Sequence, residues 1–313
     1  MADNRVYEVA RLYHLEGETM EAIAKRVGVS RSTVSRMLAT ARETGLVRVT
    51  LAPGHSATDA LARDIGEIFG VRAHVVAEAQ GELRRLDAVA RVAARLLGEW
   101  VEPGFVVGVA WGTTISAVVS HLEPHPLTGV TVVQLNGAAN QATSGIPYAG
   151  SIMTGMAEAF RASATFFPVP AFFDHTETRR AMWRERSIQR VLDVQRRCDL
   201  AVFGVGSIRG SLRSHVYTAG YLDADDLAAL SRQGVVGDMC TVFLREDGTW
   251  EDIELNARAT GPTPAELRRI ARRVCVVAGD AKVAPTLGAL RAGAVTDLVV
   301  DETTARGLLA AAR

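Results

Sequence analysis

Beyond residue 57, short apolar runs alternate with helical patterns, and this alternation constrains the fold more than any other feature of the sequence. Runs typical of buried strands cover residues 73–77, 105–110, 130–135, 165–169, 200–203, 241–244, 274–278 and 298–300. Helical spacing of apolar residues is clearest over residues 58–69 and 82–100. Several runs end in a glycine or an acidic turn that precedes a helical pattern. This rhythm predicts an α/β domain with a mainly parallel sheet, whose functional loops lie at the carboxyl ends of the strands.

The amino-terminal part of the chain follows a different pattern. Apolar residues recur at helical spacing around residues 6–13, 23–27 and 34–41, and residues 46–51 suit a strand or a wing. Residues 52–56 combine proline, glycine and small polar residues, which is typical of a linker. Because 313 residues are also about twice the usual length of one domain, we expect two domains, over residues 1–53 and 54–313.

Composition indicates a folded protein of a reducing compartment. With 48% hydrophobic and 22% charged residues, the chain falls outside the disordered and collagen-like classes. The 3 cysteines form no CxxC pair, and no run reaches the roughly 18 apolar residues of a membrane span. We therefore expect a cytoplasmic protein with no membrane partner. The formal net charge is zero, so any attraction to nucleic acid has to be local.

A local basic segment of this kind spans residues 22–42, which include no acidic residue. Thr19 and Ser30 are suited to cap two successive helices, Gly28 supplies the turn between them, and Ala24 is small where the helices cross. This pattern predicts a helix-turn-helix whose second helix enters the major groove of double-stranded DNA. The residues expected to contact DNA are Lys25, Arg26, Ser30, Arg31, Ser32, Thr33, Ser35 and Arg36.

The alternative reading of this segment is a three-helix bundle whose basic face is merely solvated. Such a bundle would share the apolar spacing, but it has no need for the cap, the turn glycine and the small crossing residue together. Lys25 and Arg26, on the first helix of the pair, are expected to anchor phosphates rather than to read bases. Which residue reads which base stays open.

Two predicted strand ends carry groups suited to a phosphate. The run at 105–110 leads into Gly112, Thr113 and Thr114, which would bring free amides of a helix amino terminus together with two hydroxyls. Lys282 follows the run at 274–278 and is one of only two lysines, against 35 basic residues in all. A lysine can act as a flexible point charge for a phosphate. An ordinary helix cap and a plain exposed lysine are the alternatives.

Two further glycine-containing turns are expected beside strands. Gly206 and Ser207 belong to a Gly-x-Gly-Ser turn after the run at 200–203, which lacks the full spacing of a dinucleotide-binding loop. Asp238 follows Gly237 before the run at 241–244, where it can accept hydrogen bonds from sugar hydroxyls or simply cap a turn. The 7 histidines form no HExxH pattern, so we expect no metal and no cofactor.

Several motifs in order resemble the SorC family of sugar-binding bacterial transcriptional regulators. Besides the helix-turn-helix, they are GVAWGTT at 108–114, FPVPA at 167–171, GVGS at 204–207, GDMC at 237–240, GDAK at 279–282 and ALRAG at 289–293. The resemblance implies an effector domain related in fold to ribose-5-phosphate isomerase and glucosamine-6-phosphate deaminase, which binds its ligand without turnover. It also implies that Gly112, Thr113, Thr114 and Lys282 hold a phosphate, while Asp238, Asn136 and Gly137 address hydroxyls. Asp280 and Ala138 replace glycines that are common in such regulators, which bears on the shape or phosphorylation of the effector.

The sequence therefore predicts a non-enzymatic regulator of a carbohydrate catabolic operon, whose affinity for its operator is controlled by a sugar or a sugar phosphate. Because two half-sites must be met at once, the protein is expected to be a homodimer or a homotetramer. The alternative is a sugar-phosphate isomerase or deaminase with a DNA-binding extension. The identity of the effector, the operator sequence and the direction of regulation stay open.

Overall fold

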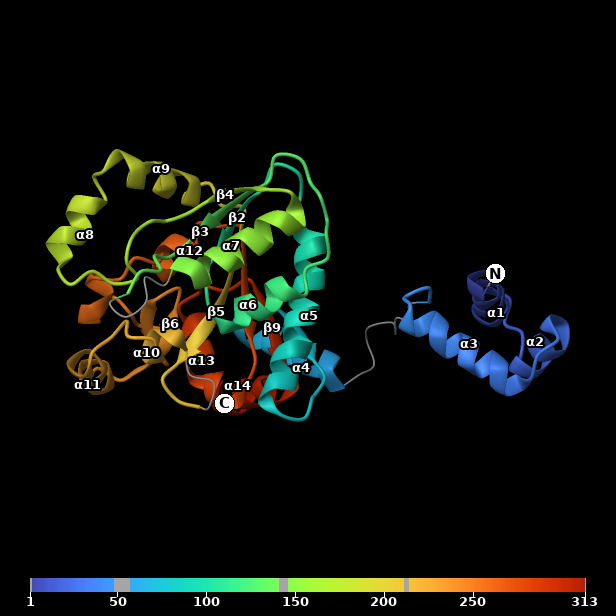
Figure 1. Cartoon of the computed structure of the whole chain (residues 1–313). Helices are drawn as coiled ribbons and strands as arrows, with labels where there is room; N and C mark the ends of the chain where they lie inside the picture. Colours follow the sequence, from blue (N-terminus) through green and yellow to red (C-terminus); the bar gives the residue numbers. More distant parts are fainter. Residues whose placement is uncertain (1, 48–56, 141–145, 211–213, 313) are drawn as a thin grey trace. The chain divides into compact units, whose positions relative to one another are not determined.

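The computed structural model describes residues 2–47, 57–140, 146–210 and 214–312. The chain divides into two compact units, Met1–Gly54 and His55–Arg313 (Figure 1). The amino-terminal unit has a hydrophobic core of its own, and two further core clusters belong to the larger unit. Among the described residues, no helix is long and apolar enough to cross a membrane.

The described part of the amino-terminal unit consists of α1 (Ala2–His14), α2 (Met20–Val27) and α3 (Arg31–Glu43). The side chains of Thr19 and Ser30 cap α2 and α3, and Gly28 ends α2 with a φ angle of 71°, in the left-handed region that favours glycine. The buried core side chains are Val9, Ala10, Leu12, Ile23, Ala24, Val34, Leu38 and Ala41. The caps, the turn and the small crossing residue Ala24 are therefore as predicted. Most of the predicted wing, residues 48–51, and the linker at 52–56 lie outside the described residues.

The described strands of the larger unit form one sheet of 9 strands. They are β1 (Arg72–Val76), β2 (Val106–Val109), β3 (Thr131–Gln134), β4 (Ser163–Thr165), β5 (Leu200–Ser207), β6 (Val235–Met239), β7 (Val242–Arg245), β8 (Arg272–Val277) and β9 (Asp297–Asp301). Seven of them follow the order β1-β9-β8-β5-β2-β3-β4 and pair in parallel. The strands β6 and β7 form an antiparallel hairpin that pairs with the end of β5.

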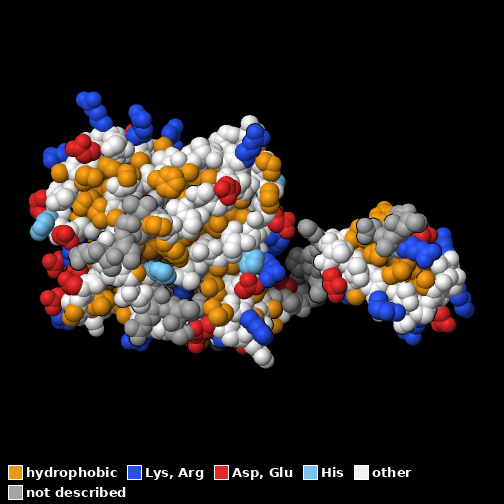
Figure 2. Space-filling view, in the orientation of Figure 1, with side chains coloured by type: hydrophobic (Ala, Val, Ile, Leu, Met, Phe, Trp, Pro, Cys, Tyr) orange, Lys and Arg blue, Asp and Glu red, His pale blue; other side chains and the backbone are white. Residues whose placement is uncertain are grey.

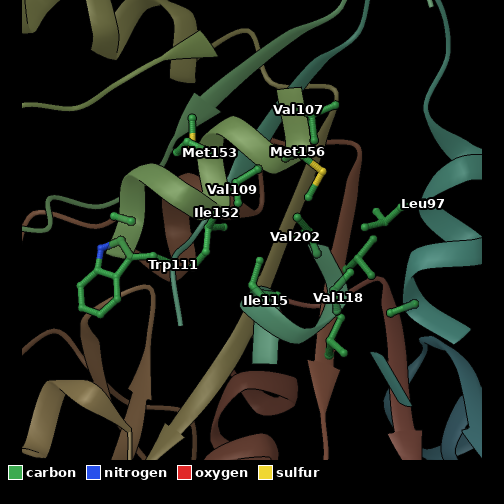
Figure 3. Close-up of a cluster of buried hydrophobic side chains, with 14 of the residues drawn as sticks. Leu97, Val107, Val109, Trp111, Ile115, Val118, Ile152, Met153, Met156 and Val202 are labelled. Carbon is green, nitrogen blue, oxygen red and sulfur yellow. The ribbon is translucent and has the colours of Figure 1, made fainter. Parts of the chain in front are cut away.

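Helices cover both faces of this sheet, as expected for a parallel sheet whose strands are apolar on both sides. They are α4 (Ala57–Phe69), α5 (Glu82–Trp100), α6 (Thr113–Ser120), α7 (Ile146–Phe160), α8 (Thr176–Met182), α9 (Arg186–Gln195), α10 (His215–Thr218), α11 (Ala224–Arg232), α12 (Pro264–Leu267), α13 (Val283–Arg291) and α14 (Glu302–Ala312), with 3-10 turns at Glu254–Ala257 and Asp280–Lys282. Side chains of α5, α6 and α7 build the core cluster on one face, which Figure 3 shows around Ile115, Met156 and Val202. Side chains of α4, α9, α13 and α14 build the cluster on the other face.

The strand order places a reversal of chain direction between β2 and β5. After β2 the chain proceeds through β3 and β4 to one edge of the sheet, and then returns to β5 on the other side of β2 before it continues through β8 and β9. Ligands of open α/β sheets bind at such a reversal, outside the carboxyl ends of the strands. The fold therefore directs attention to the loops that follow β2 and to the end of β5.

Three local predictions from the sequence are wrong. Residues 204–207 are the last part of strand β5 and not a turn, because the hairpin strand β6 extends the hydrogen-bonded ladder. Gly237 and Asp238 likewise lie within β6. The run at 165–169 is a strand only at its start, since β4 ends at Thr165 and two prolines follow closely, at 168 and 170.

Candidate functional site

The second helix of the helix-turn-helix presents a polar face to solvent. Arg31, Ser32, Ser35 and Arg36 are exposed, whereas Val34 and its neighbours at helical spacing are buried against α1 and α2. Figure 2 shows Lys and Arg side chains at the surface of this unit, with acidic side chains among them. The exposed face of α3 combines two guanidinium groups with two hydroxyls, which are donors suited to phosphates and base edges.

Other predicted DNA contacts are already engaged within the unit. The Ser30 hydroxyl accepts a hydrogen bond from the backbone N–H of Thr33 at 3.2 Å, and it lies 2.8 Å from the Thr33 hydroxyl. Arg26 forms ion pairs with Glu16 and Glu18. Lys25 is exposed on α2. The Ser32 hydroxyl also lies 2.8 Å from the Ser30 hydroxyl. The structure thus presents Lys25, Arg31 and Arg36 at the surface, while Arg26 would have to share its charge with two glutamates.

A cavity of about 60 Å³ lies at the carboxyl ends of β2, β5 and β8, where the chain reverses its direction. One water needs about 10–15 Å³ of such space, so the cavity has room for several water-sized groups. Its walls come from segments that are far apart in the sequence. The lining includes seven of the predicted effector contacts: Gly112, Thr113, Thr114, Asn136, Gly206, Asp238 and Lys282.

The amino terminus of α6 and the Lys282 ammonium face each other in this cavity. No side chain caps the first turn of α6 at Gly112, so its backbone N–H groups are available to a ligand. Lys282 Nζ donates a hydrogen bond to Thr114 Oγ1 over 3.2 Å, and Thr114 is buried. Burial lowers the pKa of the Lys282 ammonium, while nearby anionic groups, including Asp238, oppose this shift. Free amides, a hydroxyl and a cation together suit a phosphate.

Two buried side chains with hydrogen-bond acceptors line the cavity. Asn136 Oδ1 has no hydrogen-bond partner among the described residues, and the Asp238 carboxyl lies beside the Tyr217 hydroxyl and the Thr241 N–H. Burial raises the pKa of Asp238 to about 6, although the Tyr217 hydroxyl and the Thr241 N–H lower it in part. Buried acceptors of this kind are normally satisfied, and the hydroxyl groups of a bound sugar would supply the missing donors.

Trp111 forms a rigid wall between the cavity and the surrounding core. Its indole Nε1 donates a hydrogen bond to the Gly137 carbonyl over 2.8 Å, and its ring stacks on Tyr221 with centroids 5.2 Å apart. Tyr221 in turn donates to the Ala138 carbonyl over 2.8 Å. The loop after β3 is therefore tied to the loop after β2 through two aromatic side chains.

Two predicted effector contacts lie outside the lining of the cavity. A Cβ atom at Gly137 would come within 2.2 Å of the Pro170 carbonyl, so this glycine permits close packing of two backbones. The Ser207 hydroxyl donates to the Ala281 carbonyl over 2.8 Å and thereby holds the turn that carries Lys282. In the structure both residues support the walls of the cavity from outside its lining.

Sequence reasoning did not identify the hairpin turn between β6 and β7 as part of the cavity wall. Cys240 and Thr241 line the cavity and have φ angles of 50° and 68°, which residues other than glycine rarely adopt. No sequence signal marks such a turn, because neither residue is a typical turn former. Among the described residues, no group of three or more His, Cys, Asp or Glu side chains is placed to hold a metal ion.

Both units of the chain match models of known protein families. Residues 55–310 match the family model described as "Putative sugar-binding domain", and residues 5–49 match a homeodomain-like domain. The deoxyribonucleoside regulator of Bacillus subtilis (strain 168) is 31% identical over 304 residues, which cover 96% of each chain.

Solved structures are similar over the same regions. A domain of a "possible sugar-binding transcriptional regulator" from Arthrobacter aurescens TC1 is 46% identical, with a TM-score of 0.76, and covers 83% of this chain and 100% of that one. The full-length sorbitol operon regulator SorC from Klebsiella pneumoniae has a TM-score of 0.81 at 24% identity, with 97% of each chain covered. The similarity to SorC shows that the helix-turn-helix unit and the α/β unit of this chain share the fold of one solved full-length structure.

Proposed function

We propose that this chain, which belongs to the sugar-binding family of transcriptional regulators that includes SorC, regulates a carbohydrate catabolic operon. In this proposal α3 binds operator DNA, and the cavity at the strand ends binds a sugar or sugar phosphate that controls the binding. One observation carries the assignment of the cavity. It brings a cation and free helix amides together with a buried acceptor, Asn136 Oδ1, that has no donor among the described residues.

The two parts of the cavity suit the two parts of a sugar phosphate. The phosphate would lie against the first turn of α6, where Thr114 and Lys282 supply a hydroxyl and a positive charge. The sugar hydroxyls would donate to Asn136 and Asp238. Trp111, which lines the cavity, offers an apolar ring surface to the carbon skeleton. The small volume favours a short sugar over an oligosaccharide.

An enzyme is the second candidate, and one observation favours it. Asp238 has a pKa raised to about 6 by burial, and Lys282, whose pKa is lowered by burial, lines the same cavity. A carboxyl group with such a pKa is able to exchange protons near neutral pH. We nevertheless propose binding without turnover, since the relatives are named as regulators.

DNA binding in this proposal requires more than one copy of the chain. Recognition helices of paired subunits meet half-sites about 34 Å apart, so that a ligand which alters the arrangement of the subunits alters the affinity for DNA. We propose a homodimer or homotetramer that acts in the cytoplasm. The polar face of α3 would contact base edges, with Lys25 on a neighbouring phosphate.

Thermal unfolding with a panel of sugar phosphates tests the effector site. At least one compound should raise the melting temperature of the full chain without being consumed, since a ligand of the native state stabilises by mass action. The Lys282→Met variant should lose most of this response but keep its binding to operator DNA. Consumption of the compound would instead establish the enzyme, and an unchanged response in Lys282→Met would remove the lysine from the site.

Mobility shift with genomic DNA fragments tests the other half of the proposal. Replacing either Arg31 or Arg36 by glutamine should weaken retention about fivefold or more, because each base or phosphate contact contributes on the order of 1–3 kcal/mol. Arg91→Gln removes the same charge from an exposed position on α5 and serves as the control. Equal loss in all variants would show that only the overall charge matters.

A further inference from the structure

A second cavity lies behind the effector cavity, on the other side of the segment that follows β3. Its volume is about 300 Å³, within the range of small-molecule sites. Leu135 lines this second cavity, whereas the next residue, Asn136, lines the effector cavity. The walls include the apolar side chains of Leu192 and Ile270 and the ring of Trp183.

The polar groups of this second cavity are mainly cationic. Arg179, Arg196 and Arg269 line it, with Glu266 as the one carboxylate among the described lining residues. The carboxylate of Glu266 is already engaged, because its Oε2 accepts hydrogen bonds from the N–H and the hydroxyl of Thr263, each at 2.8 Å. Arg196 pairs with Asp193, which lies outside the lining, so the excess of positive charge rests on Arg179 and Arg269.

Arg179 is the guanidinium most in need of an acceptor. Its Cζ lies 4.7 Å from the centroid of the Trp183 ring, so the planar group is held over an aromatic face. Its Nε is buried and has no hydrogen-bond partner in the part of the chain that the structure describes. Burial lowers the pKa of this guanidinium, and the Glu266 charge only partly opposes the shift. A buried donor without an acceptor is destabilising, and a bound anion would relieve this cost.

Trp183 is itself fixed by the core. Its ring makes edge-to-face contacts with Phe167 and Phe173, with centroid distances of 5.6 Å and 5.9 Å. The cation–π pair therefore presents a prepared surface, with a charged plane at one end and an apolar wall at the other. A guanidinium suits a planar carboxylate better than a round anion, because the two groups pair through parallel N–H donors.

We propose that this second cavity binds a small monocarboxylate with an apolar body, about the size of a single six-membered ring, and that Arg179 pairs with its carboxylate. A sugar would leave its hydroxyls against Leu135 and Ile270. A neutral apolar molecule would leave the Arg179 donor buried and unpaired. The proposed ligand would pair with the Arg179 guanidinium and pack against the apolar wall, and it is chemically distinct from the effector of the first cavity.

Cyclohexanecarboxylate and its neutral amide are suitable probes, because neither absorbs where tryptophan does. In the full chain, the carboxylate should raise the melting temperature and change the tryptophan fluorescence saturably, and the amide should bind at least tenfold more weakly. Arg179→Gln should weaken carboxylate binding at least tenfold. Arg180→Gln, a change at an exposed neighbour on the same helix that does not line the cavity, should leave it unchanged.

Further variants locate the binding and guard against misfolding. Trp183→Phe should remove the fluorescence change while most of the thermal response remains. Arg269→Gln, at an exposed position, should weaken binding about threefold even if Arg179→Gln fails to fold. Lys282→Met should leave carboxylate binding intact, which separates this cavity from the effector cavity. The proposal would be overturned if no saturable response were seen or if the amide gave an equal response. It would also be overturned if Lys282→Met lost carboxylate binding while Arg179→Gln and Arg269→Gln both kept it.

Discussion

The buried carboxyl of Asp238 makes the stability of the larger unit depend on pH in an unusual direction. Burial raises its pKa from 3.8 to about 6, so the folded chain holds this proton more tightly than the unfolded chain does. The resulting contribution to stability is present in full below about pH 4 and is lost as the pH rises through about 6. With 1.36 kcal/mol for each pKa unit, ionising the buried group costs about 3 kcal/mol at pH 8.

The Asp238→Asn variant removes this ionisation with little change of shape. Relative to the wild type, its free energy of unfolding should rise by about 3 kcal/mol between pH 4 and pH 8, equivalent to roughly 6–12 °C in melting temperature for a unit of this size. Urea unfolding at one-unit pH intervals measures the difference directly. The same variant should bind the effector less tightly, because an amide in place of the carboxylate removes one acceptor for its hydroxyls.

Asp247→Asn is the matched control for this experiment. Hydrogen bonds from the Thr249 N–H and hydroxyl lower the pKa of the exposed Asp247 carboxyl, so its contribution to stability appears as the pH rises and has the opposite sign. A difference between wild type and Asp238→Asn that stays constant from pH 4 to pH 8 would refute the reasoning. It would mean that the Asp238 carboxyl is better solvated than its burial implies.

Three further substitutions test the local packing of the two units. Gly261→Ala should lower the melting temperature strongly, because a Cβ atom would lie 1.6 Å from the Cys240 carbonyl oxygen. Gly112→Ala should be tolerated, since nothing lies within 4 Å of its Cβ position. A smaller loss of melting temperature at Gly261 than at Gly112 would contradict this view. Ser30→Ala removes the cap that accepts from the Thr33 N–H and should cost about 1 kcal/mol, seen as roughly fivefold faster hydrogen exchange in the first turn of α3, while unchanged exchange would show that water replaces the cap.

The features that the sequence predicted correctly are those with a strong local cause. Apolar periodicity identified most of the strands, and the caps at Thr19 and Ser30 identified the two helices of the helix-turn-helix. The turn at Gly112 and the lysine at 282 were recognised because each follows a buried strand closely. These signals extend over a few residues, so no knowledge of the tertiary structure was needed.

The errors concern glycines whose role is set by distant segments. Gly206 and Gly237 were interpreted as turn residues, but they allow two neighbouring strands to approach closely, since a Cβ at Gly237 would lie 2.1 Å from the Gly206 carbonyl oxygen. The same difficulty applies to Gly137, which packs against the Pro170 carbonyl rather than lining the cavity. A glycine that permits close approach and a glycine that permits a turn are identical in sequence.

The segment after β3 separates the effector cavity from the second cavity described above. Neighbouring residues Leu135 and Asn136 belong to different cavities, and Gly261, which lines the second cavity, packs against the Cys240 turn that lines the first. Atoms on one side of such a partition cannot shift without displacing those on the other. Substitutions within this shared partition that favour a new effector should therefore also alter what the adjoining cavity accepts, so that the two specificities evolve together.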